Sequence, residues 1–252
     1  MGFQNKVVIV TGAGVGIGRA AAVLFAQKGA KVVVNSITPA NGEETLRQIQ
    51  QAGSEGIYVR ADVSKPEDCK RIVDEAMAAF GRVDVLVNNA GIVLRGTIDD
   101  TTLADFDRTM DVNVKGTLLM CQLVVPIMRS QGGGSIVNTA SVLATKGAKD
   151  RIAYSASKGA VLSLSRAMAA ELIRENIRVN CVSPGSTYTP SLEARINASP
   201  DPAAALRDFQ ARQPMGRLGK ASEIAQAILF AADEEAGFLN GHDLVIDGGS
   251  RI

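Results

Sequence analysis

Val7-Val8-Ile9-Val10-Thr11-Gly12-Ala13-Gly14-Val15-Gly16-Ile17-Gly18-Arg19 is the stretch that decides the fold. A short β-branched run comes first, a glycine-rich turn follows, and an alanine-rich helical pattern begins after it. The spacing is GxxxGxG, using Gly12, Gly16 and Gly18, rather than GxGxxG. Such glycines permit a tight turn and close approach of the backbone to a pyrophosphate, which the helix N-terminus then holds. Between a strand and a helix this predicts a dinucleotide site, with a flexible turn as the alternative.

The rest of the chain repeats this alternation of short β-branched runs and longer helical patterns. Strands are predicted at 6–10, 31–35, 56–61, 83–87, 134–138, 177–182 and 243–246, and helices near 16–28, 40–52, 66–79, 102–130, 152–174 and 221–232. Alternation at this spacing predicts an α/β fold, a parallel sheet with helices on both faces, as one domain over 1–252. The segment at about 186–220, rich in Ala, Pro, Arg and Gln, lacks a strand pattern and is predicted to be a substrate-binding lid.

Composition restricts the class of partner. Lys and Arg number 27 and Asp and Glu 26, so no bulk charge attracts nucleic acid or a membrane surface. Cys69, Cys121 and Cys181 are far apart and His242 is the only histidine, which argues against a metal site or a disulfide framework. The apolar region 118–128 is too short to span a bilayer. We expect a cytoplasmic protein with no metal.

The second predicted strand ends in Asn35-Ser36-Ile37-Thr38. Folds that prefer NAD carry an acidic residue here, which binds the ribose hydroxyls. No acid is present, so nothing repels a 2′-phosphate, and Ser36 or Thr38 offers it a hydrogen bond. This favours NADP weakly, because no arginine stands at Val15 or Ile37 to bind the phosphate. A loop without cofactor discrimination is the alternative.

Tyr154 and Lys158 lie four residues apart in a segment with helical character, and therefore on one helix face. A tyrosine titrates near ~10, and a neighbouring cation favours the phenolate. Lowering that pKa by about three units requires roughly 4 kcal/mol. A buried lysine together with a cationic cofactor can supply this, whereas a lysine on a wet surface cannot. Taken alone, such a pair is in most cases an ordinary i,i+4 contact on a helix surface.

The remaining motifs occur in one order along the chain: TGxxxGIG at 11–18, Asp62-Val63, Asn88-Asn89-Ala90-Gly91, Asn113, Ser141, Tyr154 with Lys158, Pro184-Gly185 and Asp247-Gly248-Gly249. Over nearly its whole length the chain resembles the short-chain dehydrogenase/reductase family. That resemblance implies a doubly wound Rossmann fold with a seven-stranded parallel sheet and an NAD(P)(H) cofactor. It also implies a homotetramer, built through helices 102–130 and 152–174 and contacts around 238–252.

The resemblance assigns roles to four residues. Tyr154 matches the family's acid/base, Lys158 the residue that lowers the tyrosine pKa and binds the nicotinamide ribose, and Ser141 the residue that orients the substrate oxygen. Asn113 matches the position at a helix kink that holds a water relay. The resemblance places these residues at the cofactor: Gly12, Gly16, Ile17, Gly18, Ser36, Asp62, Val63, Asn89, Ala90, Gly91, Tyr154, Lys158, Pro184, Gly185, Thr187 and Thr189. Thr187 departs from the Val or Ile common at its position.

The lid resembles a narrower branch of the family, which contains cytosolic 3-hydroxybutyrate dehydrogenases and dehydrogenases of 2-keto-3-deoxy sugar acids. In the former, three arginines surround the substrate carboxylate, and Arg151, Arg195 and Arg212 match their positions. A guanidinium binds a carboxylate through two parallel hydrogen bonds, so converging arginines favour an anionic substrate. Solvated charges on helix surfaces are the alternative. Ser141 and Tyr154 complete the predicted substrate site, and Gly147, Lys149 and Gln213 are further candidates for its lining.

The sequence therefore predicts an NAD(P)-dependent oxidoreductase that interconverts a secondary alcohol and a ketone on a small hydroxy acid or 2-keto-3-deoxy sugar acid. A 3-oxoacyl-carrier-protein reductase is the first alternative, although the chain shows no obvious basic cluster for docking an acidic carrier. A cofactor-binding protein without catalysis is the second. The presence of Asn113, Ser141, Tyr154 and Lys158 argues against it.

Overall fold

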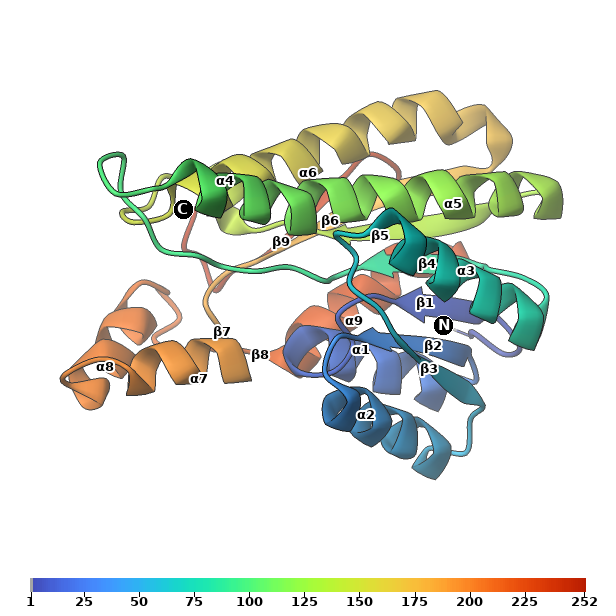
Figure 1. The fold of residues 1–252 in the computed structure, drawn as a ribbon, viewed down its shortest axis with the longest axis horizontal. Coiled ribbons are helices and arrows are strands. Elements are labelled where there is room, and N and C mark those ends of the chain that lie inside the picture. Colours follow the sequence, from blue (N-terminus) through green and yellow to red (C-terminus); the bar gives the residue numbers. More distant parts are fainter. Residues whose placement is uncertain (1) are drawn as a thin grey trace.

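A computed structural model describes residues 2–252, and its centre is a parallel sheet of seven strands in the order β3-β2-β1-β4-β5-β6-β9 (Figure 1). The strands are β1 (Val7–Val10), β2 (Lys31–Ser36), β3 (Gly56–Arg60), β4 (Val85–Asn88), β5 (Gly134–Thr139), β6 (Ile177–Pro184) and β9 (Asp243–Ile246). All seven predicted strands are present, with bounds within two residues of those expected. The chain order reverses between β1 and β4, and ligands of such sheets bind in the crevice beyond that point.

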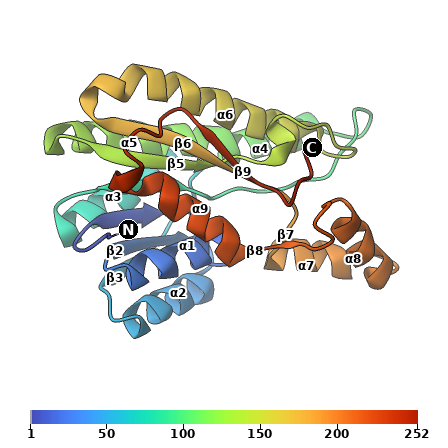
Figure 2. The same cartoon turned by 180° about the vertical axis from the view of Figure 1, so that it is seen from behind.

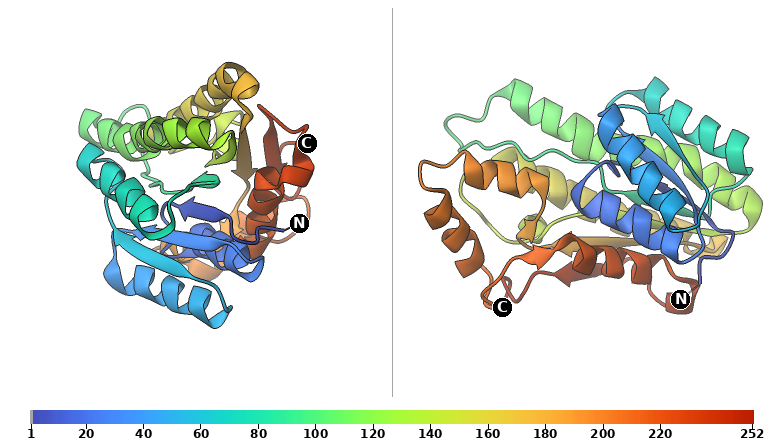
Figure 3. Two further views of the ribbon diagram at one scale, coloured as in Figure 1. Left: turned by 90° about the vertical axis from the view of Figure 1, so that its right-hand side faces the viewer. Right: turned by 90° about the horizontal axis from the view of Figure 1, so that it is seen from below.

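The helices cover both faces of the sheet, as Figures 2 and 3 show. Those that pack on the sheet are α1 (Gly16–Gln27), α2 (Pro39–Gln51), α3 (Pro66–Phe80), α5 (Gly116–Gln131), α6 (Ile152–Leu172) and α9 (Ala221–Ala232). Along β1, Val8 and Val10 belong to the cluster under α1 and α9, whereas Ile9 belongs to the cluster under α3 and α5. Successive side chains of a strand point to opposite faces. Both faces are therefore apolar, which explains the nearly continuous valine runs of the sequence.

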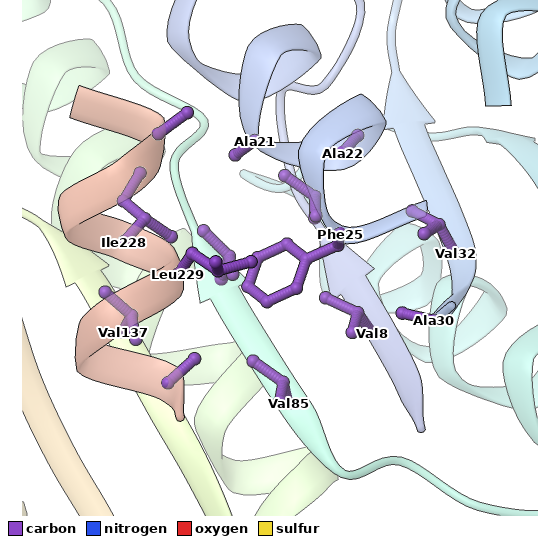
Figure 4. Close-up of a cluster of buried hydrophobic side chains, with 14 of the residues drawn as sticks. Val8, Ala21, Ala22, Phe25, Ala30, Val32, Val85, Val137, Ile228 and Leu229 are labelled. Carbon is purple, nitrogen blue, oxygen red and sulfur yellow. The ribbon is translucent and has the colours of Figure 1, made fainter. Parts of the chain in front are cut away.

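Phe25 of α1 is the largest fully buried side chain of the first cluster. Figure 4 shows its ring between helices α1 and α9 and the strand residues Val8 and Val85. Alanines at 21 and 22 bring α1 close to the sheet beside it. This close packing fixes the start of α1, and with it the glycine-rich turn, relative to the ends of β1 and β4.

The predicted helix at 102–130 is interrupted in the middle. Helix α4 (Leu103–Met110) passes through a π-helical turn, Asp111–Lys115, before α5 begins. The whole segment Leu103–Gln131 is long and apolar enough, by composition alone, to cross a membrane. Here it packs as a core helix, because Met120, Val124 and Met128 are buried against the sheet. The π turn is the kink that the resemblance to the family implied at Asn113.

The prediction that 186–220 contains no strand is wrong. Two residues, Thr187–Tyr188 (β7), pair in parallel with Gly219–Lys220 (β8) and join the two ends of the segment. Between them lie α7 (Pro190–Asn197) and α8 (Pro202–Ala211), which extend beyond the sheet in Figure 1. Pairs of only two residues carry too short a pattern to be read from sequence. Leu192, Ile196 and Leu218 form a small core of this segment's own.

Candidate active site

A single large cavity of about 1360 Å³ lies at the carboxyl ends of the central strands, under α7 and α8. All but two of the predicted catalytic, cofactor and substrate residues line it. The exceptions are Gly18 and Asn113, which lie directly behind the wall. The cavity therefore joins residues from the first glycine-rich turn to the lid, which are separated by about 200 positions in sequence.

The glycine-rich turn forms a backbone cradle. Gly12 and Gly16 have φ values of +62° and +59°, which other residues rarely adopt. A Cβ on Gly12 would lie 2.7 Å from Cα of Ala90, and one on Gly18 would lie 2.4 Å from the Gly12 carbonyl oxygen. Helix α1 starts without a side-chain cap and without an acidic residue in its first turn. Its first N–H groups are thus free to hold an anion, as a pyrophosphate requires.

Residues around the turn fix its position. Asn89 donates from Nδ2 to the carbonyl oxygens of Thr11 and Gly12, at 3.0 and 3.2 Å. Asn35 accepts from the Gly12 N–H at 3.2 Å. Asp62 accepts from the backbone N–H and the hydroxyl of Ser64, at 3.0 and 2.7 Å, in the part of the cavity where an adenine would lie. These hydrogen bonds within the protein position the residues of a dinucleotide site before the cofactor binds.

The cavity lining at the edge formed by Ser36, Ile37 and Thr38 carries no charged side chain. The Ser36 hydroxyl exchanges hydrogen bonds with the backbone of Thr38, both at 3.2 Å. The sequence interpretation found no arginine for this edge. In the structure Arg19 of α1 lies close by, where it donates to the carbonyl oxygens of Gly14 and Asn41. Arg19 belongs to helix α1, and the sequence interpretation considered only the loop positions Val15 and Ile37, so it did not predict this arginine.

Tyr154, Ser141 and Lys158 meet at the centre of the cavity. Tyr154 and Lys158 lie one turn apart on α6, with the Lys158 Nζ 5.8 Å from the centre of the Tyr154 ring. Ser141 follows β5, where its hydroxyl accepts from the Leu143 N–H and hydrogen-bonds Tyr154. Lys158 is buried and donates to the Thr139 carbonyl oxygen at 2.7 Å. The predicted trio is therefore assembled, with a hydroxyl pair beside a buried amine.

The pKa values of this trio differ from the sequence expectation. Burial raises the pKa of Tyr154, while the hydrogen bond to Ser141 and the charges of Arg195 and Arg151 act in the opposite direction. Burial also lowers the pKa of Lys158 to about 8. The charges that favour the phenolate thus come from the arginines rather than from Lys158. Desolvation disfavours both charged forms, and neither group is activated by the pair alone.

Asn113 lies in the π turn and is almost wholly buried. Its side chain accepts from the Ile92 N–H at 2.8 Å and donates to the Ile92 carbonyl at 3.0 Å and the Ser157 hydroxyl at 2.9 Å. A Cβ on Gly91 would lie 3.1 Å from its oxygen and 3.5 Å from Lys158 Nζ. Asn113 therefore positions the loop after β4 against α6, next to Lys158. The water relay that the resemblance implied remains a prediction.

Arg151, Arg195 and Arg212 all line the cavity beside Tyr154. Within residues 2–252 none of these guanidiniums forms an ion pair. Burial and mutual repulsion lower the pKa of Arg151 and Arg195. Because unbalanced cations that face one another are costly, the arrangement favours an anion between them.

Two further residues of this region were missed by the sequence interpretation. The Phe209 ring lies under both lid arginines, with its centre 4.5 Å from the Arg212 guanidinium carbon and 5.8 Å from that of Arg195. Arg95 lines the cavity mouth from the loop after β4. Phe209 stands three residues before Arg212, a spacing that places both on one helix face. Arg95 had no local pattern, since only the tertiary fold brings its loop to α6.

Comparisons with known proteins agree with this geometry. The family model described as enoyl-(acyl carrier protein) reductase matches residues 12–251. An uncharacterized oxidoreductase of Thermotoga maritima is 50% identical, covering 99% of both chains, and dehydrogenase/reductase SDR family member 6 of Xenopus laevis is 41% identical over 98% of both. The crystal structure of L-sorbose reductase from Gluconobacter frateurii, in complex with NADPH and L-sorbose, superposes with a TM-score of 0.95 at 30% identity, covering 99% and 98% of the two chains.

Proposed function

We propose that this chain, which belongs to the short-chain dehydrogenase/reductase family, interconverts the alcohol and ketone forms of a small substrate that carries a carboxylate. Membership makes it an NAD(P)-dependent oxidoreductase that acts on CH–OH groups. The observation that carries the proposal is the group of guanidiniums without ion-pair partners in the described part of the chain, Arg151 and Arg195 near Tyr154 and Arg212 near those two, in one cavity. A hydroxy acid or a 2-keto-3-deoxy sugar acid fits this pocket.

Each residue of the site has a separate role in the proposed reaction. The bound nicotinamide supplies or accepts the hydride. The Tyr154 hydroxyl gives a proton to the substrate oxygen in reduction and takes it in oxidation, while the Ser141 hydroxyl holds that oxygen. The arginines hold the carboxylate and so orient the carbon that reacts. Burial raises the pKa of Tyr154, and the positive charges of Arg195 and Arg151 offset part of that rise, which assists oxidation.

Initial rates on hydroxy acids, sugar acids and neutral alcohols of matched size test the substrate class. Replacing Arg151, Arg195 or Arg212 singly by Ala should lower kcat/KM on the acids at least tenfold, about 1.4 kcal/mol, and leave neutral alcohols nearly unchanged when each variant is compared at its own pH optimum. Equal rates on acids and alcohols in the unmodified enzyme would contradict the proposal. Preference for acyl thioesters of a carrier protein would instead favour the 3-oxoacyl-carrier-protein reductase alternative.

We propose NADP(H) as the preferred cofactor. The support is the absence of a carboxylate among the residues lining the cavity at Ser36, Ile37 and Thr38, and the positive charge of Arg19 below that edge. Ser36→Asp places a carboxylate where a 2′-phosphate would lie, so NADP should lose at least tenfold in kcat/KM relative to NAD. A native enzyme that already prefers NAD would refute this choice.

A further inference from the structure

The loop after β4 is joined to the start of α6 at the mouth of the cavity. The Gly96 N–H donates to the Asp150 carbonyl oxygen at 3.2 Å, and the Ile152 N–H donates to the Gly96 carbonyl at 3.4 Å. A Cβ on Gly96 would lie 2.4 Å from the Thr101 hydroxyl, so glycine lets the loop fold back on its own Thr101. This pairing places Arg95 opposite Asp150, and their side chains form an ion pair of 3.1 Å.

Arg95 is the fourth member of a group of arginines whose charges repel one another. It lines the same cavity as Arg151, Arg195 and Arg212, and its charge reduces the pKa of Arg151 and of Arg195. It differs from those three because it has a carboxylate partner. Within this group of mutually repelling arginines, four guanidiniums and the Asp150 carboxylate leave an excess of three positive charges, of which one substrate carboxylate would balance only one.

We propose that Arg95 binds a second carboxylate of the substrate, in place of Asp150, so that the preferred substrate is a hydroxy or keto dicarboxylic acid. The proposal rests on the proposed function, because it assigns the first carboxylate to the three unpaired arginines. Asp150 already shows that a carboxylate fits against Arg95 at the cavity mouth. The ligand carboxylate would take the same position from the cavity side.

Replacing the Asp150 carboxylate at Arg95 by a substrate carboxylate costs little free energy. The Arg95 and Asp150 side chains are 70% and 38% exposed, and ion pairs of that exposure contribute little to stability. Asp150 remains accessible to water when it is released, so no charge is left buried. A substrate that bridges Arg95 and the inner arginines gains from both carboxylates, whereas a monocarboxylate leaves the Arg95–Asp150 pair closed.

Binding to the cofactor-loaded enzyme tests the proposal by isothermal titration. The probes are 3-hydroxyglutarate and 3-hydroxyhexanoate, which are similar in size and differ by one carboxylate. We expect 3-hydroxyglutarate to bind about fivefold more tightly, and Arg95→Gln to remove that difference while 3-hydroxyhexanoate changes by about twofold or less. Asp150→Asn should increase the ratio, since asparagine tolerates the φ of +56° at this position and leaves Arg95 unpaired.

Arg47→Gln is the matched control, because Arg47 forms an exposed ion pair with Glu44 on α2 outside the cavity lining. An Arg95→Gln variant that weakens both acids equally, or an Asp150→Asn variant that lowers the ratio, overturns the second carboxylate site. Arg195→Ala separates this from the proposed function. If both acids fail to bind, or bind Arg195→Ala as tightly as the native enzyme, the carboxylate pocket itself is refuted; if only the ratio is insensitive to Arg95, the pocket stands and the dicarboxylate does not.

Discussion

Removing the aromatic face of Phe209 should weaken the enzyme's hold on acidic substrates without touching the reacting groups. The ring supports both lid arginines, at 4.5 Å from Arg212 and 5.8 Å from Arg195. Each contact between a guanidinium and an aromatic face at a partly exposed site contributes about 0.5–1 kcal/mol. Two such contacts stabilise the positions of the two guanidiniums by about 1–2 kcal/mol in total, and Phe209→Leu removes this stabilisation.

The expected result is a rise in KM on hydroxy acids and a drop in kcat/KM of about 5- to 30-fold, with kcat less affected. The reason is that misplaced guanidiniums weaken ground-state and transition-state binding alike, while Tyr154 and Ser141 are unchanged. Neutral alcohols should react at the native rate. Steady-state kinetics on a matched acid and alcohol, at saturating cofactor, measure both quantities.

Three controls make the outcome specific. Phe209→Tyr retains the ring face and should stay within about twofold of the native enzyme. Phe80→Leu removes a ring that lies 5.6 Å from Lys31 Nζ outside the cavity lining, and should have no effect on KM. In an Arg212→Ala background the Phe209→Leu loss should shrink, because only the Arg195 contact remains to be lost. A full-sized loss in that background, or an equal loss on neutral alcohols, would refute the orienting role of the ring.

Three further outcomes follow from the same site. Tyr154→Phe should abolish turnover and leave cofactor binding largely intact in a fluorescence titration; near-normal kcat would remove Tyr154 from the proton transfer. Lys158→Met should raise the free energy of unfolding by about 3 kcal/mol at pH 7, because the folded-state pKa of about 8 lies below the value of 10.5 for the free side chain. The unfolded chain binds that proton more readily below pH 10.5, so the gain should decline between pH 8 and 10.5 in denaturant titrations, and a pH-independent gain would contradict the burial argument. Arg195→Ala should raise the pKa of Tyr154 and move the pH profile of oxidation to higher pH; an unmoved profile would contradict the electrostatic coupling.

The sequence was sufficient for the fold because each layer of the sheet carries a local pattern. Runs such as Val32–Val34 are apolar on both faces, and the glycines at 12, 16 and 18 mark the turn where the cofactor is expected. Residues whose role depends on contacts distant in sequence were not predicted. Arg95 reaches the pocket only through the pairing of Gly96 with the start of α6.

The pKa of Tyr154 could not be predicted for a related reason. An i,i+4 lysine suggested a lowered value, but burial of this pair disfavours the charged form of each group. The spacing gave the identity of the neighbours and no information on how much solvent they retain. The short pair β7–β8 was missed because two residues are too few to form a period.

Substrate binding and proton transfer share the same charges in this pocket. Burial raises the pKa of Tyr154 and lowers that of Arg195, and the interaction between the two groups offsets part of each change, with Arg151 acting on Tyr154 in the same direction as Arg195. A carboxylate that settles between the arginines offsets part of their positive charge, so Tyr154 should titrate at higher pH in the substrate complex than in the free enzyme. The pH dependence of kcat/KM reports the free enzyme and that of kcat reports the complex. For an acidic substrate the two profiles should therefore separate, whereas for a neutral alcohol they should coincide, because only the acid alters the charge that acts on Tyr154.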